Sequence, residues 1–131
     1  MNRQLQRDVE VGTIDPYDFE AGERLYESIR EMGDDVAAIA RHTGISEARI
    51  ARIKLHIFSN FHQLDDGVRR FDADPLIVNA WQRLREDRHT LQDVQLLKHE
   101  FFESRFEGIF KTTYRIAHEA TNRSGRPSGL E

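Results

Sequence analysis

Apolar residues recur along this chain at spacings of three and four, which is the period of an amphipathic helix rather than of a strand. The first such segment, residues 15–33, carries Phe19, Gly22, Tyr26 and Ile29 on one face. No segment alternates apolar and polar residues over the length of a strand. The pattern therefore predicts an all-α fold in which each helix buries one face.

Capping residues divide this pattern into about six helices. The predicted helix starts are residues that cap N-termini, followed by proline in two cases. They are Asp15-Pro16, Asp34 or Asp35, Ser46, Asp74-Pro75, Thr90, and Thr112 or Thr113. We expect one compact domain over residues 15–122, preceded by an arm at 1–14 and followed by a flexible tail at 123–131.

Residues 36–53 resemble a helix-turn-helix unit of the DNA-binding type. Gly44 permits the turn at a positive φ angle, and Ser46 caps a second helix that is expected to continue through Phe58. The cations that this interpretation assigns to nucleic-acid contacts are Arg49, Arg52 and Lys54 on the second helix, and Arg69 and Arg70 in an irregular link.

Composition narrows the possible partners. The chain has 131 residues and a net charge of -4, so no overall basic field draws it to nucleic acid, although a local basic patch still can. It has no cysteine, which excludes disulfides, thiolate zinc sites and a cysteine nucleophile. No window approaches the ~18 apolar residues of a membrane span, and the N-terminus does not resemble a signal peptide. We therefore expect no membrane partner, and a cytoplasmic location either in the producing cell or, after delivery, in a target cell.

The segment 96–104 places a titratable pair on the apolar face of a long helix predicted over residues 91–110. His99 and Glu103 are four residues apart, so their side chains share a face and come within hydrogen-bond reach. The apolar residues on that face are Leu96, Phe106 and Phe110. A buried pair of this kind is costly unless its members satisfy each other, so it is either a structural hydrogen bond or the base of a site.

The core is predicted where the apolar stripes of two helices meet. Trp81 and Leu84 lie at core positions of the helix that follows Asp74-Pro75. Leu97 and Phe101 lie at core positions of the long helix. We expect these four side chains to be buried together.

Six histidines are the main candidates for chemistry. Four of them lie in helix-linked positions near apolar residues: His56, His62, His99 and His118. The other two, His42 and His89, lie in predicted turns and are expected at the surface. Any one of the four can be an ordinary half-buried, hydrogen-bonded histidine. Packing alone does not require so many histidines together with neighbouring carboxylates and arginines, so the group indicates a candidate site.

Several short blocks of the sequence resemble one family. The blocks are His56…His62, Arg70-Phe71-Asp72-Ala73-Asp74, Trp81-Gln82-Arg83-Leu84, Leu97-Lys98-His99-Glu100…Glu103 and Ala117-His118. Across about residues 18–122 they resemble the small helical domains found at the C-terminal ends of phage minor head proteins and bacterial polymorphic toxins. The resemblance implies a toxin-like effector domain, commonly a nuclease, with RNA or DNA and a cognate immunity protein as partners.

Three functional interpretations stay open. In the first, a metal-independent nuclease cleaves RNA by histidine acid–base chemistry and needs no cofactor. Its residues are His99 as the base, Glu103 to orient it, His118 or His56 as the acid, and Arg83 or Arg70 as the phosphate-binding cation.

In the second interpretation, His99, Glu103 and His118 bind the ion of a metal-dependent hydrolase. The segment 99–103 departs from the His-Glu-x-x-His pattern of zinc peptidases because Glu103 replaces the second histidine, and a carboxylate can also bind metal there. In the third, residues 36–54 form a DNA-binding or protein-interaction module, and the pair on the long helix belongs to the core.

Overall fold

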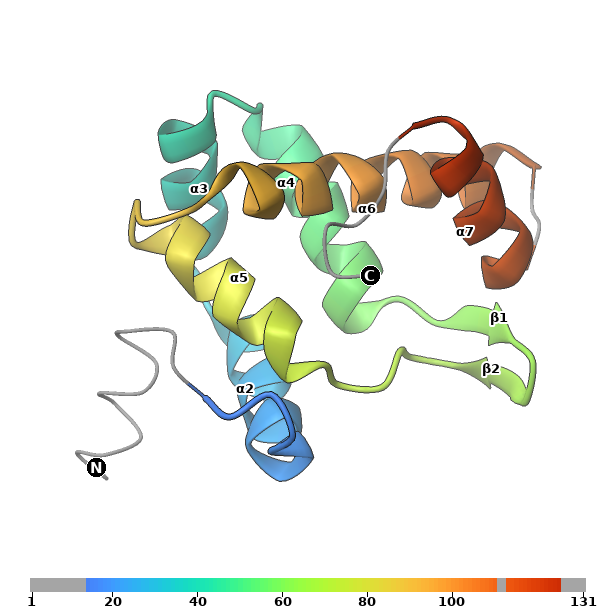
Figure 1. Ribbon diagram of the computed structural model, residues 1–131, viewed down its shortest axis with the longest axis horizontal. Coiled ribbons are helices and arrows are strands. Elements are labelled where there is room, and N and C mark those ends of the chain that lie inside the picture. Colours follow the sequence, from blue (N-terminus) through green and yellow to red (C-terminus); the bar gives the residue numbers. More distant parts are fainter. Residues whose placement is uncertain (1–13, 111–112, 126–131) are drawn as a thin grey trace.

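Six α-helices make up most of the described part of the chain. The computed structural model describes residues 14–110 and 113–125 (Figure 1). The helices are α2 (Phe19–Glu31), α3 (Asp35–Thr43), α4 (Glu47–Lys54), α5 (Pro75–Arg85), α6 (Leu91–Phe110) and α7 (Tyr114–Arg123). Between α4 and α5 lie a π-helical turn, η1 (Leu55–Ser59), and two short strands, β1 (His62–Leu64) and β2 (Gly67–Arg69). The predicted all-α fold in one compact domain is confirmed.

The longest helix, α6, is central to the packing. It contacts α4, α5, η1 and α7. In Figure 1 it runs across the molecule, with α5 below its first half and α7 and the hairpin at its other end. Because α7 also contacts β1, the last helix and the hairpin close the same end of the molecule.

The core brings together side chains from all the elements from α2 to α6 except the hairpin. Phe58 packs edge-to-face on Trp81, with ring centroids 5.2 Å apart. Trp81, Leu84 and Leu97 are fully buried, as predicted. Phe101 is only partly buried against the same cluster.

Four of the predicted helix caps form through side-chain hydrogen bonds. The capping oxygens are those of Ser46, Asp74, Thr90 and Thr113, which accept from the backbone N–H groups of Arg49, Leu76, Asp93 and Ile116. Gly44 has a φ of 76°, in the left-handed region, so α3 and α4 form the predicted bihelical unit.

The predicted start of the first helix is wrong. Helix α2 begins at Phe19 and is capped by Asp18, whose Oδ1 accepts a hydrogen bond from the Ala21 N–H at 3.0 Å. Asp15-Pro16 forms a turn before the helix, because Asp15 Oδ1 accepts a hydrogen bond from the Tyr17 N–H at 2.7 Å. Phe19, which we expected on the buried face, opens the helix and is 58% exposed.

Two features between α4 and α5 differ from the sequence prediction. The second helix of the bihelical unit is α-helical only to Lys54 and continues as the π-helical turn η1 through Ser59. The strands β1 and β2 pair antiparallel, with His62 opposite Arg69, around the turn that the sequence predicts at 65–67. Strands of three residues are too short to show the alternation by which strands are recognised.

Of the two predicted terminal segments, the structure describes only residue 14 and residues 123–125. Most of the arm predicted at 1–14 and of the tail predicted at 123–131 lies outside the described residues. Ile14 is described and buried, and its backbone N–H and C=O bond to the Asn79 side chain at 3.2 and 3.1 Å. Among the described residues, none of the helices combines the length and the hydropathy that a membrane crossing needs.

A buried polar triad ties α3 to α4 and α5. The Asp35 carboxylate, 0% exposed, accepts hydrogen bonds from Lys54 Nζ at 2.9 Å and from Trp81 Nε1 at 2.9 Å. Lys54 Nζ also donates to the Met32 carbonyl at 2.8 Å. Lys54, one of the cations expected to contact nucleic acid, is therefore turned into the protein.

Replacing Asp35 by Asn should destabilise the fold by about 3–5 kcal/mol, because the Lys54 ammonium would stay buried without its counter-charge. Chemical denaturation followed by the fluorescence of Trp81 measures the free energy of unfolding. The matched control is Asp34→Asn, because the Asp34 side chain is 75% exposed. The control should change the free energy by less than about 0.5 kcal/mol, and equal effects of the two substitutions would contradict the role of the buried pair.

Candidate functional site

A buried carboxylate on α6 gathers three histidines around it. Glu103 is 1% exposed, and its Oε1 lies 2.8 Å from His56 Nε2. Its Oε2 lies 2.9 Å from His118 Nδ1 and 3.2 Å from His99 Nε2. The contact between His99 and Glu103 is the one that their spacing on the helix predicts. We refer to Glu103 and its three histidines as the Glu103 cluster.

Three elements bring this cluster together. His99 and Glu103 lie one turn apart on α6. His118 lies on α7, which packs against α6, and the His118 and His99 ring centroids are 5.0 Å apart. His56 lies on η1, and the π-helical turn places it inside the protein at 1% exposure.

A second carboxylate faces His56. Glu100 Oε2 lies 3.2 Å from His56 Nε2, which is the same ring nitrogen that contacts Glu103. Glu100 is also buried. One nitrogen atom of His56 therefore lies between two carboxylates.

The cluster shifts the pKa values of its own members. Burial by itself lowers the pKa of His56, but the hydrogen bonds and negative charges of Glu100 and Glu103 outweigh burial and raise that pKa to about 9. Burial by itself raises the pKa of Glu103, but the hydrogen bonds of the three histidines and the charge of His56 lower it to about 2. In the metal-free protein at neutral pH, His56 is thus an imidazolium held by two carboxylates.

His62 holds the backbone of His56 in place. Its Nε2 lies 2.8 Å from the carbonyl oxygen of His56, and its Nδ1 lies 2.9 Å from Glu107 Oε2. The Phe71 ring stacks on the His62 ring at 3.8 Å. Because both of its ring nitrogens have these contacts, His62 fixes the backbone of η1 at the position from which His56 reaches the cluster.

Three cavities within the described residues reach the cluster, and one of about 520 Å³ has His56 in its wall. The other two share part of their walls. A cavity of about 510 Å³ has His118 in its wall, and the His118 side chain is 28% exposed. A smaller cavity of about 240 Å³ has Glu100 and Glu103 in its wall. The side chains common to both walls are Phe71, Asp72 and Tyr114. Glu103 therefore faces one of these two cavities and His118 the other.

Three sets of side chains in the described residues place metal-ligand atoms within 4.8 Å of one another. They are His99, Glu103 and His118; His56, Glu100 and Glu103; and His56, His62 and Glu107. The first set is the one that the second functional interpretation predicts. The first two sets share Glu103, and the last two share His56.

The cations expected to contact phosphates each have a partner within the protein. Arg83 forms a two-point ion pair with Asp93 at 2.8 and 2.9 Å, at the start of α6 and not at the Glu103 cluster. The other pairs are Lys54 with Asp35, Arg52 with Ser104, Arg49 with the Phe101 ring, Arg69 with Asp66 and Asp72, and Arg70 with the Ser59 carbonyl. Three of these five cations lie on α4, and the other two lie at the end of the hairpin.

Two expectations about surface and core are wrong. Leu96 is buried as expected, but Phe110 is 64% exposed because it borders an open groove. His42 lies within the last turn of α3, and its Nδ1 lies 2.8 Å from the Leu84 carbonyl oxygen. His42 and His89 are each partly buried rather than exposed.

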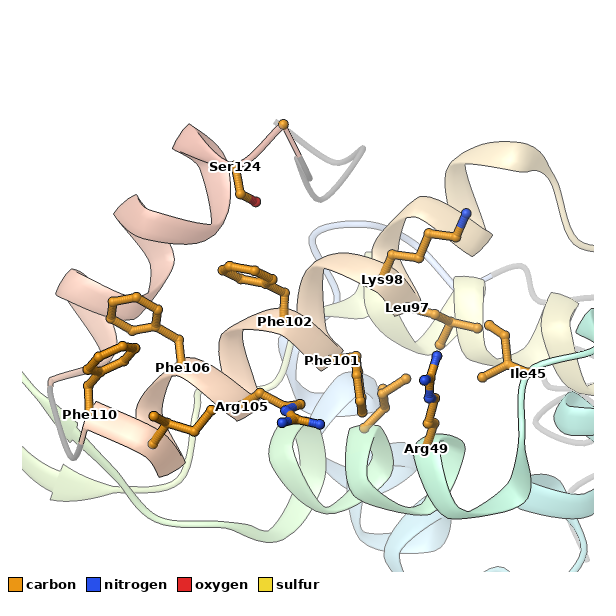
Figure 2. A pocket seen from close by; sticks show the side chains of 13 residues that line it. Ile45, Arg49, Leu97, Lys98, Phe101, Phe102, Arg105, Phe106, Phe110 and Ser124 are labelled. Carbon is orange, nitrogen blue, oxygen red and sulfur yellow. The ribbon is translucent and has the colours of Figure 1, made fainter.

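That groove runs along α6 and has a volume of about 800 Å³ (Figure 2). Its aromatic lining residues are Phe101, Phe102, Phe106 and Phe110. The guanidinium carbons of Arg49 and Arg105 lie 5.1 and 5.9 Å from the centroid of the Phe101 ring. No member of the Glu103 cluster is among the residues that line this groove, so the two features are separate.

Comparisons with protein-family models, with curated proteins and with solved structures gave no match. The resemblance to the domains of phage minor head proteins and polymorphic toxins therefore stays a prediction. Function has to be argued from the geometry of the site.

Two carboxylates of the site have no role in the sequence-based interpretations. Glu100 faces His56, and Glu107 faces His62. A signal for them exists, because residues 100, 103 and 107 have the i, i+3, i+7 spacing of one helix face. The spacing does not show which histidines from other parts of the chain contact this face of the helix.

The metal-free protein should lose stability as the pH rises above neutrality. The raised pKa of His56 stabilises the fold fully below its unfolded value of about 6.5, and this contribution is lost as the pH rises through about 9. The lowered pKa of Glu103 affects stability at acidic pH. Its contribution to the free energy of unfolding is present above pH about 4.5 and is lost as the pH falls through about 2.

Chemical denaturation of chelator-treated protein at a series of pH values measures this effect. Between pH ~6.5 and pH ~9.5, the free energy of unfolding should fall by an amount on the order of a few kcal/mol. The variant His56→Asn should show a flatter profile over the same range, whereas His89→Asn should keep the wild-type profile. A wild-type profile that stays flat would contradict the charged state of His56.

Proposed function

We propose that the protein is a metal-dependent hydrolase whose ion is bound by His99, Glu103 and His118. The observation that carries the proposal is the convergence of two ring nitrogens on one carboxylate oxygen. His118 Nδ1 lies 2.9 Å and His99 Nε2 lies 3.2 Å from Glu103 Oε2. Two imidazoles and one carboxylate suit zinc, iron and manganese, and they leave coordination positions open for water and substrate.

The spacing of these atoms fits an ion without a large rearrangement. Ligand atoms at ~2.0–2.1 Å from a tetrahedral ion are about 3.3 Å from one another. The distances from Glu103 Oε2 to the two ring nitrogens, 2.9 and 3.2 Å, are close to that separation. The three ligand atoms all lie within 4.8 Å of one another, so the residues of the set are already gathered at one point.

An ion in this position would polarise the bond to be hydrolysed and lower the pKa of a bound water toward neutrality. His99 and Glu103 are each 1% exposed, so they hold the ion from the interior. His118 is the partly exposed member, and the cavity of about 510 Å³ at its side gives the substrate an entry.

The wall of that cavity favours a phosphodiester as the substrate. Arg69 and Arg115 line it, together with the aspartates with which they pair, Asp65, Asp66 and Asp72. Arg69 pairs with Asp66 and Asp72, which are 66% and 88% exposed, and Arg115 lies 3.7 Å from Asp65. Exposed ion pairs of this kind are weak, so a phosphate group can displace the carboxylates.

This proposal keeps the nucleic-acid substrate that the family resemblance implies and replaces the metal-independent mechanism. That mechanism needs His99 as a base in contact with substrate, but His99 is 1% exposed. It also assigns Arg83 or Arg70 to the phosphate, but Arg83 forms its two-point ion pair with Asp93, and Arg70 donates to the Ser59 carbonyl.

Titration of chelator-treated protein with Zn²⁺ or Mn²⁺ in a calorimeter tests the proposal. The wild-type protein should bind the ion, and His118→Ala should weaken binding at this set by at least about 100-fold because one of three ligands is lost. His89→Ala is the matched control, since His89 lies outside all three ligand sets, and it should bind as the wild type does.

Cleavage of RNA and DNA by the same samples tests the reaction. Activity should require the added ion, disappear in His118→Ala and persist in His89→Ala. Cleavage that is unchanged by a chelator would support the metal-independent mechanism instead. Failure of the wild-type protein to bind either ion would overturn the metal site.

A further inference from the structure

We infer that the cluster binds a second ion, between Glu103 Oε1, Glu100 and His56, so that Glu103 bridges two metals. The inference rests on the proposed function, because it places the second ion beside the first. It also sharpens that function, because paired ions 3.5–4 Å apart are typical of enzymes that cleave phosphate esters, such as nucleases and phosphatases, and of some aminopeptidases.

The two oxygens of Glu103 have different partners. Oε2 faces His99 and His118, which are the ligands of the first ion. Oε1 faces His56 Nε2 at 2.8 Å. A carboxylate that presents each oxygen to a separate group of ligands has the arrangement in which it bridges two cations.

The second ion would have three ligands of its own: Glu103 Oε1, Glu100 and His56. Only Glu103 is shared with the first ion. Glu100 Oε2 lies 3.2 Å from His56 Nε2, so two carboxylate oxygens and one ring nitrogen converge. A ring nitrogen carries at most one hydrogen, which cannot point fully at both carboxylates. A divalent ion that displaces the proton of His56 Nε2 would contact all three ligand atoms at once and balance the two negative charges.

Neighbouring residues fix this second group. His62 Nε2 lies 2.8 Å from the His56 carbonyl oxygen, and His62 Nδ1 lies 2.9 Å from Glu107 Oε2. Both ring nitrogens of His62 are thus engaged, and we assign His62 the role of a support of His56 rather than of an ion ligand, although Glu107 Oε1 is buried without a hydrogen-bond partner among the described residues. Outer partners of this kind orient the residues that hold a metal.

Each of the two ions would lie beside a cavity. Glu100 and Glu103 line the cavity of about 240 Å³, and His118 lines the cavity of about 510 Å³. The two cavities share Phe71, Asp72 and Tyr114 in their walls. In such a two-metal site, one ion would hold the oxygen of the attacking water and the other would hold the leaving oxygen of a phosphate ester.

The number of bound ions tests the inference directly. Chelator-treated protein is loaded with Mn²⁺, freed of excess ion, and analysed for metal content and by electron paramagnetic resonance. The wild-type protein should hold two ions per chain and show the signal of a spin-coupled pair. Glu100→Gln should hold one ion and lose the coupled signal, because it removes a ligand of the second site only.

Two controls separate ligand loss from loss of fold. Glu107→Gln leaves both ligand groups intact and should keep two ions and the coupled signal. Circular dichroism of each variant verifies that the helices persist. His118→Ala should also lose the coupled signal, because it removes a ligand of the first ion.

The outcomes distinguish this inference from the proposed function. One ion in the wild-type protein, unchanged in Glu100→Gln and lost in His118→Ala, would overturn the second site and leave the hydrolase proposal standing. Two ions in both the wild type and Glu100→Gln would place the second ion elsewhere and overturn the inference. No bound ion in the wild-type protein would overturn both.

Discussion

Burial of the Glu103 carboxylate at 1% exposure costs several kcal/mol unless other groups replace the water that it loses. Three histidines from η1, α6 and α7 supply that replacement. The packing of α7 on α6 and the position of η1 beneath them are therefore constrained by one side chain. An apolar residue at position 103 would pack without these requirements, so the structure is organised around a polar centre rather than only around a hydrophobic core.

The irregular segment between α4 and α5 serves this centre. A regular α-helix from Ser46 through Phe58 would carry His56 on a face set by 3.6 residues per turn. The π-helical turn η1 changes that face, and π-helical turns inside helices are frequent at functional sites. The hairpin then returns the chain so that His62 contacts the carbonyl oxygen of His56. The π-helical turn and the hairpin thus place His56 at the Glu103 carboxylate, and the contact with that carboxylate accounts for the irregular backbone.

The sequence predicts local features of this protein well and long-range ones poorly, for a physical reason. Caps and the i,i+4 contact of His99 with Glu103 depend on residues within one turn of each other. The contact of His56 with Glu103 joins residues 47 apart in the chain, and no periodicity encodes it. The same limit explains Lys54, since a cation on a helix looks solvent-exposed until the buried Asp35 that it meets is known.

The distances within the cluster bear on how it changes between a hydrogen-bonded and an ion-bound state. The four nitrogen–oxygen contacts run from 2.8 to 3.2 Å. Hydrogen bonds have this length, and ligand atoms around a small divalent ion are only slightly further apart, at about 3.3 Å. The hydrogen bonds therefore already gather the side chains that would hold the proposed ions. A centre that is gathered in this way would lower the conformational cost of ion binding and would couple metal affinity to the stability of the fold.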